Sequence, residues 1–141
     1  MGTIHQTATF VGVTPRELYD AFLDSRVHSA MTGGAARMSR RVDGAWTAWD
    51  RDLCGKNVKL VPGKRIVQSW RGGDFPEGHY STATFILAKA GTGTRVTLHQ
   101  TGVPDDLVAN YTQGWRQFYW TPMKAYFRSR AGRATHESRR G

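Results

Sequence analysis

The sequence predicts an α+β fold: a curved antiparallel sheet of about seven strands, a long C-terminal helix over one face, and two short helices after the first strand. Two observations lead to this prediction. Short apolar runs between residues 36 and 101 are separated by turn sequences such as Asp43-Gly44 and Pro62-Gly63, which is typical of antiparallel hairpins. From Pro104 onward the large apolar residues recur every three or four positions, which indicates an amphipathic helix.

The N-terminal part of the chain predicts one strand followed by two short helices. Residues 3–11 alternate weakly and are rich in β-branched side chains, which favours a strand. Thr14, Pro15 and Glu17 are a helix start signal, because threonine caps the helix, proline fits its first position and glutamate reaches back to the cap amide. Asp24, or the serine after it, can cap a second short helix that a pair of glycines ends.

The middle of the chain predicts the rest of the sheet. The strands are expected at residues 36–40, 45–49, 53–61, 65–71, 78–88 and 95–101. The connection formed by residues 72–78 is longer than a tight turn and carries an aromatic side chain. We therefore expect this loop to form the rim of a cavity, with Phe75 and His79 at the rim.

The last predicted element is the long helix. Its apolar face carries two stripes, made of Val108, Tyr111, Trp115, Phe118, Pro122 and Tyr126 and of Trp120, Met123 and Phe127. Pro122 is expected to kink the helix, because its ring clashes with the carbonyl of Phe118 and it donates no hydrogen bond. The helix is long enough to cover one face of the sheet.

The length of the chain predicts one domain, residues 1–127, followed by a basic and flexible tail, residues 128–141. The formal net charge is +9, and the tail alone supplies four of these nine charges, since it holds five arginines against one glutamate. A solvated terminus explains this better than an arm that binds nucleic acid or a membrane surface. The single cysteine, Cys54, excludes an intrachain disulfide, and no apolar run is long enough to insert into a membrane. We therefore expect a soluble, cytoplasmic protein.

Four segments carry a resemblance to a known family: LVPGKRIVQSWR (60–71), PEGH (76–79), GTRVTL (93–98) and GWRQFYW (114–120). With the order of the elements, they resemble the Aha1 C-terminal-like family (Activator of Hsp90 ATPase homologue 1-like), within the START-like (SRPBCC) superfamily. The resemblance covers roughly residues 7–127 and implies a helix-grip fold. It also implies a chaperone partner and a role in the stress response, because the namesake co-chaperone stimulates the Hsp90 ATPase. The separate N-terminal half of that co-chaperone has no counterpart here, so we expect that this chain alone does not activate an Hsp90 ATPase.

The sequence predicts no catalytic residue, no metal site and no cofactor. The five histidines show no ligand spacing with one another, with Cys54 or with a carboxylate, and no phosphate-binding loop occurs. His79 could act as a general base, but a histidine that orders its loop by hydrogen bonds explains it better.

Two glutamines indicate a binding site. Alternation places Gln68 with Trp70 on one face of their strand and Gln100 with Leu98 on one face of theirs, toward the long helix. A buried amide without partners costs about 1–3 kcal/mol, so each glutamine needs a hydrogen bond from the protein, from water or from a ligand. We predict a cavity between sheet and helix with these residues, the glutamines as its polar contacts: Gln68, Trp70, Phe85, Leu98, Gln100, Trp115, Tyr119 and Met123. The alternative is a pair of interior glutamines bonded to tyrosine or backbone.

The resulting hypothesis is a non-catalytic protein that binds a hydrophobic or amphipathic small molecule, since the wider superfamily holds such molecules between sheet and helix. An Hsp90 co-chaperone-like interaction module is the first alternative. A cavity enzyme of the polyketide cyclase or dehydratase type is the second, so the possibility of catalysis stays open.

Overall fold

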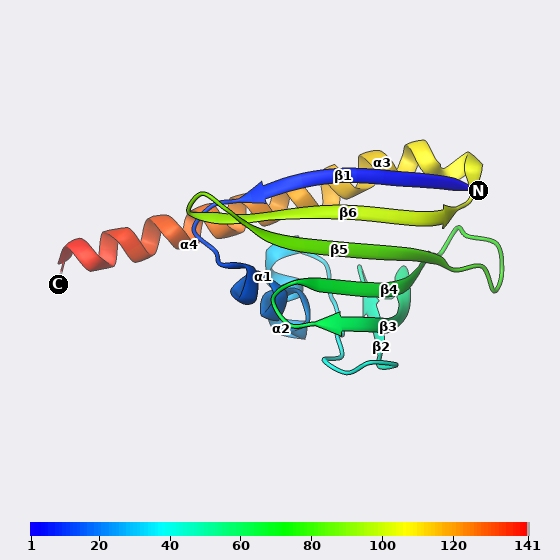
Figure 1. Cartoon of the computed structure of the whole chain (residues 1–141), viewed down its shortest axis with the longest axis horizontal. Helices are drawn as coiled ribbons and strands as arrows, with labels where there is room; N and C mark the ends of the chain where they lie inside the picture. The colour runs from blue at the N-terminus through cyan, green and yellow to red at the C-terminus, as the bar shows by residue number, and fades with distance from the viewer. Residues whose placement is uncertain (141) are drawn as a thin grey trace.

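The computed structural model describes residues 1–140, with side chains through Arg130. Its elements follow in this order: β1 (Gly2–Phe10), α1 (Pro15–Phe22), α2 (Ser25–Thr32), β2 (Ala45–Ala48), β3 (Leu53–Val61), β4 (Arg65–Gly72), β5 (Ser81–Ala90), β6 (Gly93–Val103), the 3-10 turn η1 (Asp105–Leu107), α3 (Val108–Trp115), the π-helical turn η2 (Arg116–Trp120) and α4 (Thr121–Arg140). The strands form a six-stranded antiparallel sheet in the order β1-β6-β5-β4-β3-β2. The predicted α+β class is confirmed (Figure 1).

The first two helices begin as the sequence predicts. The N-terminal cap of α1 is Thr14, whose hydroxyl accepts from the Glu17 amide at 3.1 Å while Glu17 accepts from the Thr14 amide at 3.0 Å. Asp24 caps α2 by accepting from the Val27 amide at 2.9 Å. Gly33 ends α2 in the left-handed conformation, with φ of 89°, which glycine adopts without steric cost.

The predicted strand at residues 36–40 is wrong. In this segment only Arg37 pairs with the sheet, through an isolated bridge to Thr47. The neighbouring amides bond to α2 instead: the Ala36 amide donates to the Ser29 hydroxyl at 2.9 Å and the Met38 amide to the Ser25 hydroxyl at 2.8 Å. Because these donors are occupied by serine side chains, the strand ladder does not extend, and the sheet has six strands rather than seven.

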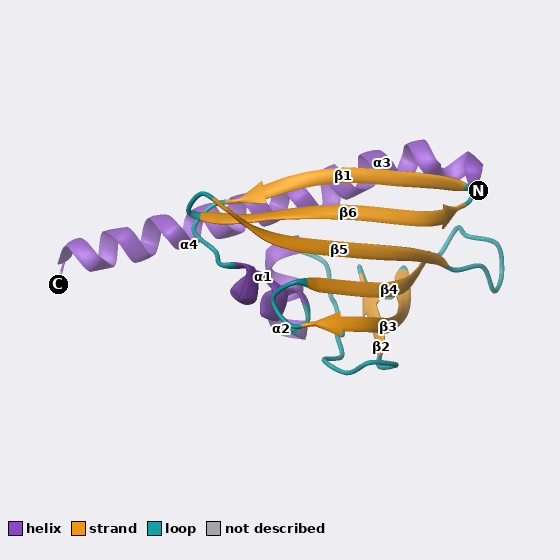
Figure 2. Cartoon of the chain, in the orientation of Figure 1, coloured by secondary structure: helices purple, strands orange, loops and turns teal. Residues whose placement is uncertain are grey.

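The long C-terminal helix crosses the sheet and runs behind β1 and β6 in the view of Figure 2. Pro122 lies near the start of α4, directly after the π-helical turn η2. The Thr121 amide donates to the carbonyl of Arg116, five residues back, so the helix is wider at this point. The kink expected at Pro122 stays a prediction, and the irregularity that the structure shows is the π-turn before the proline.

The helical side of the sheet holds the core. Buried side chains of the strands, among them Ile66, Phe85 and Leu98, meet Trp115 and Met123 of the helix. The helix continues to Arg140, and the side chains after Arg130 lie outside the described residues. The division into a domain, residues 1–127, and a flexible tail, residues 128–141, thus stays a prediction. Within the described part of the chain, every helix is too short or too polar to cross a membrane.

Candidate functional site

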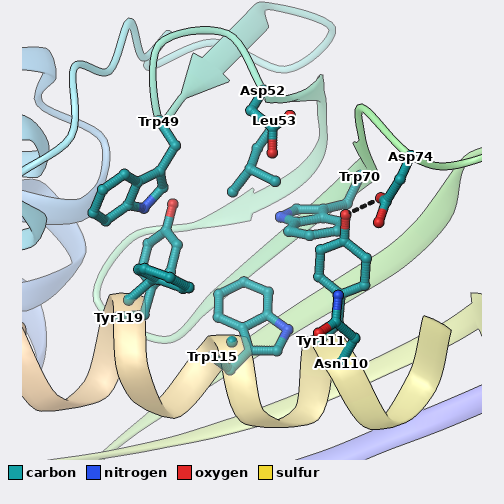
Figure 3. Close-up of a pocket in the computed structure, with 11 residues that line it drawn as sticks. Trp49, Asp52, Leu53, Trp70, Asp74, Asn110, Tyr111, Trp115 and Tyr119 are labelled. Atoms are coloured by element: carbon teal, nitrogen blue, oxygen red, sulfur yellow. Dashed lines mark hydrogen bonds between the residues drawn. The ribbon is translucent and has the colours of Figure 1, made fainter.

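A pocket of about 450 Å³ lies between the C-terminal helix and the β3–β4 side of the sheet (Figure 3). Its lining comes from the turn between β2 and β3, the start of β3, the end of β4, the loop after β4, and α3 with η2. The lining residues are Trp49, Asp52, Leu53, Trp70, Asp74, Asn110, Tyr111, Gly114, Trp115, Phe118 and Tyr119. A volume of this size can hold a small organic molecule.

The pocket has an apolar floor and a polar mouth. Leu53, Trp70 and Trp115 are buried and form part of the floor, whereas Asp52 and Asp74 are exposed at the mouth. Trp70 and Trp115 pack with their ring centroids 5.4 Å apart. Such a pocket can bury an apolar group while it leaves a polar group of the same molecule close to water.

An unusual turn holds Trp49 at the pocket. Trp49, Asp50 and Arg51 have φ values of 50°, 56° and 75°, a left-handed conformation that non-glycine residues rarely adopt. The Asp50 amide donates to the carbonyl of Ala35 at 3.0 Å, which ties the turn to the segment after α2. Gly34 lies against the indole, since a Cβ built there would come within 2.5 Å of Trp49 Cε3. The close contact and the turn together fix the position of the indole.

The indole nitrogen of Trp49 has a free hydrogen-bond donor. Among the buried side-chain nitrogen and oxygen atoms of the described residues, Trp49 Nε1 is the one without a partner. In Figure 3 the nitrogen-bearing edge of this indole is turned toward the other lining residues. A buried donor left unpaired costs about 1–3 kcal/mol, so an acceptor brought by a ligand would recover this cost.

The mouth of the pocket contains a hydrogen-bonded pair. The Tyr111 hydroxyl donates to the Asp74 carboxylate (Figure 3). Burial, and then this hydrogen bond and the negative charges of Asp74 and Asp52, raise the pKa of Tyr111 well above its ordinary value. Tyr111 therefore stays protonated and keeps Asp74 in place beside the pocket.

A second polar pair joins Tyr119, which lines the pocket, to His28, which is buried outside the lining. His28 Nδ1 donates to the carbonyl of Phe22 at 2.8 Å, because a carbonyl can only accept. His28 Nε2 is therefore unprotonated and accepts from the Tyr119 hydroxyl at 3.0 Å. Burial lowers the pKa of His28 to about 4 and raises that of Tyr119, so both groups are neutral near pH 7.

Of the eight residues predicted to line a cavity, three line this pocket: Trp70, Trp115 and Tyr119. Phe85 and Met123 line a separate space of about 10 Å³, too small for a ligand. Leu98 is fully buried and belongs to neither lining. These six residues thus divide between pocket and core.

The two glutamines bond to the protein, and neither lines the pocket. Gln68 Nε2 donates to Asn57 Oδ1 at 3.0 Å. Gln100 Nε2 donates to the Ser81 hydroxyl at 2.9 Å, and its Oε1 accepts from Trp115 Nε1 at 2.9 Å. These glutamines are placed to connect elements of the core, and a role for either in ligand binding stays a prediction.

Phe75 and His79, the predicted rim residues, do not line the pocket. Phe75 is buried and packs against Trp70 and Tyr111, with centroid distances of 5.9 and 5.5 Å. His79 Nε2 donates to the carbonyl of Gly102 at 2.7 Å, which anchors the loop to the end of β6. The loop contributes Asp74 to the pocket instead.

Sequence reasoning missed most of the polar lining. It did not select Trp49, Asp52, Asp74, Asn110 or Tyr111, which come from three segments of the chain. One signal was available: Tyr111 belongs to the apolar stripe of the predicted helix, one turn before Trp115. No three His, Cys, Asp or Glu side chains come together at metal-binding distance within the described part of the chain.

Comparison with known proteins identifies the family. The sequence pattern of the family described as "Activator of Hsp90 ATPase homolog 1-like protein" matches residues 12–128, most of the chain. The chain belongs to this family. A human protein named "Activator of 90 kDa heat shock protein ATPase homolog 1" is 30% identical over 114 residues, which cover 81% of this chain and 34% of the human protein. This Aha1-like chain thus spans about a third of that relative's length.

Solved structures confirm the helix-grip arrangement. An HSP90 activator from Plasmodium falciparum aligns with a TM-score of 0.80 at 20% identity, covering 88% of this chain and 94% of that one. A protein from Chromobacterium violaceum aligns with a TM-score of 0.71 at 26% identity, covering 89% and 96%. The Aha1-like chain therefore has the START-like fold that its sequence motifs indicate.

Proposed function

We propose that this Aha1-like chain is a module that binds an Hsp90-class chaperone. The observation that carries the proposal is the family match over residues 12–128, together with a human relative whose name describes an activator of the Hsp90 ATPase. Because the similarity covers about a third of that relative, the proposal concerns binding by this domain rather than the activity of the whole relative.

The outer face of the sheet is available for such a partner. The helix covers the opposite face, and Arg65, Ile86 and Arg95 are exposed on the outer one. Ile86 is 38% exposed and pairs across the strands with Arg65. An exposed aliphatic side chain beside basic ones can contact an apolar patch with an acidic border on the chaperone.

The test is to titrate the purified chain into the Hsp90-class chaperone of its own organism and to measure both binding and ATP turnover. We expect saturable binding that weakens at least about tenfold in an Arg65→Glu/Ile86→Asp variant. The two substitutions place negative charge against the acidic border proposed for the chaperone and bury a carboxylate in the contact. We expect little change in turnover. Absence of binding contradicts the proposal, and a several-fold stimulation shows that this domain alone is an activator.

The second candidate function is the binding of a small molecule in the pocket, and the unpaired Trp49 Nε1 is the observation that favours it. Apolar walls around one free donor are typical of small-molecule sites. The pocket and the outer face of the sheet lie on different parts of the molecule, so one chain can carry both functions. Variants inside the pocket separate them.

Gly114 provides a matched pair of variants for this second function. A Cβ at Gly114 would meet only Phe118 Cδ2, at 3.9 Å, so a side chain there extends into open space. Gly114→Ala is expected to stabilise the protein by about 0.5–1 kcal/mol, because glycine is unfavourable inside a helix. Gly114→Leu is expected to fill the pocket.

Native mass spectrometry of protein purified from its own source measures the outcome. We expect wild type and Gly114→Ala to retain a small molecule that Gly114→Leu has lost, with chaperone binding unchanged in all three. Equal retention by Gly114→Leu, or no retained molecule in any of them, contradicts a ligand in this pocket.

A further inference from the structure

The pocket has a charge opposite to that of the protein as a whole. The chain carries 20 Lys and Arg against 11 Asp and Glu, yet the pocket lining holds two aspartates and no Lys or Arg. A concave site with low-dielectric walls concentrates the field of its own charges. The charged side chains that line this pocket are thus both negative, on a chain whose net charge is positive.

Both carboxylates at the mouth are free to take a cationic partner. The ion pairs among the described residues involve other carboxylates, those of Asp20 and Asp105. Asp74 accepts one hydrogen bond, from Tyr111, which leaves further acceptor positions on its oxygens. Figure 3 shows Asp52 and Asp74 on the same side of the pocket, above the rings of Trp70 and Trp115.

The guanidinium of Arg71, whose charge acts on Tyr111, is directed elsewhere. The Arg71 guanidinium donates to the carbonyls of Phe75 and Pro76, at 3.1 and 3.3 Å, and lies over the ring of Tyr80. Arg71 is not part of the pocket lining. Arg71 therefore makes no ion pair with Asp74 among the described residues, and its charge lowers the pKa of Tyr111 less than the charges of Asp74 and Asp52 raise it.

Aromatic rings form the wall next to these carboxylates. Tyr111 and Trp70 pack edge to face with centroids 5.3 Å apart, and Trp115 lies against Trp70. Figure 3 shows these rings around the space below Asp52 and Asp74. Tryptophan and tyrosine rings attract organic ammonium groups through their negative faces, and they also bury the carbon atoms attached to the nitrogen.

We propose that the pocket binds an organic cation: a small molecule with an ammonium group on an apolar body. The ammonium lies between the aromatic rings and the carboxylates of Asp52 and Asp74, and the apolar body reaches the floor at Leu53 and Trp115. Trp49 Nε1 donates to an ether, hydroxyl or carbonyl oxygen where the molecule has one. This inference rests on the second candidate function, ligand binding in the pocket, and adds the chemical class of the ligand.

Three probes of similar shape test the charge preference: benzyltrimethylammonium, its uncharged carbon analogue neopentylbenzene, and the anion benzylsulfonate. Binding is measured by tryptophan fluorescence at low salt, because Trp49, Trp70 and Trp115 line the pocket. We expect the cation to bind at least about tenfold more tightly than the neutral probe, and the anion to bind most weakly.

Two variants test whether the carboxylates of Asp52 and Asp74 bind the cation. Asp52→Asn and Asp74→Asn remove one charge each, and an asparagine at position 74 can still accept from Tyr111. We expect each to weaken binding of the cation about three- to tenfold and to leave the neutral probe unchanged. Asp24→Asn is the matched control, since Asp24 lies outside the lining and asparagine also caps a helix. The control is expected to bind all three probes like wild type.

The outcomes distinguish a failure of the cation preference from a failure of ligand binding in the pocket. If neutral and cationic probes bind equally, or if the aspartate variants bind the cation like wild type, the pocket binds ligands but the cation preference is wrong. If Gly114→Leu abolishes binding of every probe, the site is the pocket. If none of the probes binds wild type at millimolar concentration, both the inference and the candidate function are contradicted.

Discussion

Replacing Gln100 by leucine is expected to lower the free energy of unfolding by about 2–4 kcal/mol. Gln100 is fully buried, and its amide connects Ser81 of β5 to Trp115 of the helix. Leucine removes both hydrogen bonds and leaves Trp115 Nε1 buried without an acceptor. The amide with partners is thus stabilising, whereas an amide without partners would have made the same substitution favourable.

Chemical denaturation of the variant measures this effect. The matched control is Gln113→Leu, because Gln113 is exposed on the same helix. We expect the control to stay within about 0.5 kcal/mol of wild type. A double-mutant cycle with Trp115→Phe isolates the bond between the two residues, since removal of both partners leaves no unpaired group. A Gln100→Leu variant as stable as wild type would show that this bond contributes nothing.

The protein is expected to lose stability as the pH falls from 6.5 to 4, and His28 is the reason. Burial lowers the pKa of His28 from 6.5 to about 4. Between these values the unfolded chain binds a proton that the folded protein does not, so the free energy of unfolding decreases with falling pH. The decrease reaches about 3 kcal/mol near pH 4 and stops once the folded histidine is protonated as well.

The His28→Gln variant isolates this contribution. Unfolding free energies of variant and wild type are compared at several pH values between 4 and 7, which cancels the titration of groups that both share. We expect the variant to be the less stable protein at pH 7, because Tyr119 and Phe22 lose their partner, and the difference to shrink toward pH 4. His99→Gln is the control, since His99 is exposed. A difference that stays constant across this range would contradict the buried neutral histidine.

Local sequence patterns were enough to predict most of the elements. The cap formed by Thr14 and Glu17, the stop at Gly33 and the turn at Pro62-Gly63 each depend on residues a few positions apart. Strand alternation also placed Gln68 and Gln100 in the interior correctly. The strand expected at residues 36–40 failed because its amides bond to serines of α2, and local alternation carries no information about such partners.

The pocket could be predicted only in part, for the same reason. Trp70, Trp115 and Tyr119 follow from the faces of one strand and one helix, which periodicity defines. Gln100 accepts from Trp115, and this pairing depends on how the helix is rotated against the sheet, which periodicity does not define. A similar bond joins Gln6 of β1 to Trp120 at 2.8 Å.

The sequence by itself therefore determined the α+β class, the family and the residues of the two packed faces, because periodicity, turn residues and family motifs are properties of short segments. Only the tertiary structure decided which amides are paired and where the free space remains. Trp49, Asp74 and Tyr111 are far apart in the chain and come from a turn, a loop and a helix. Their meeting, which gives the pocket its free donor and its acidic mouth, results from the packing of the helix against the sheet, and no local pattern encodes it.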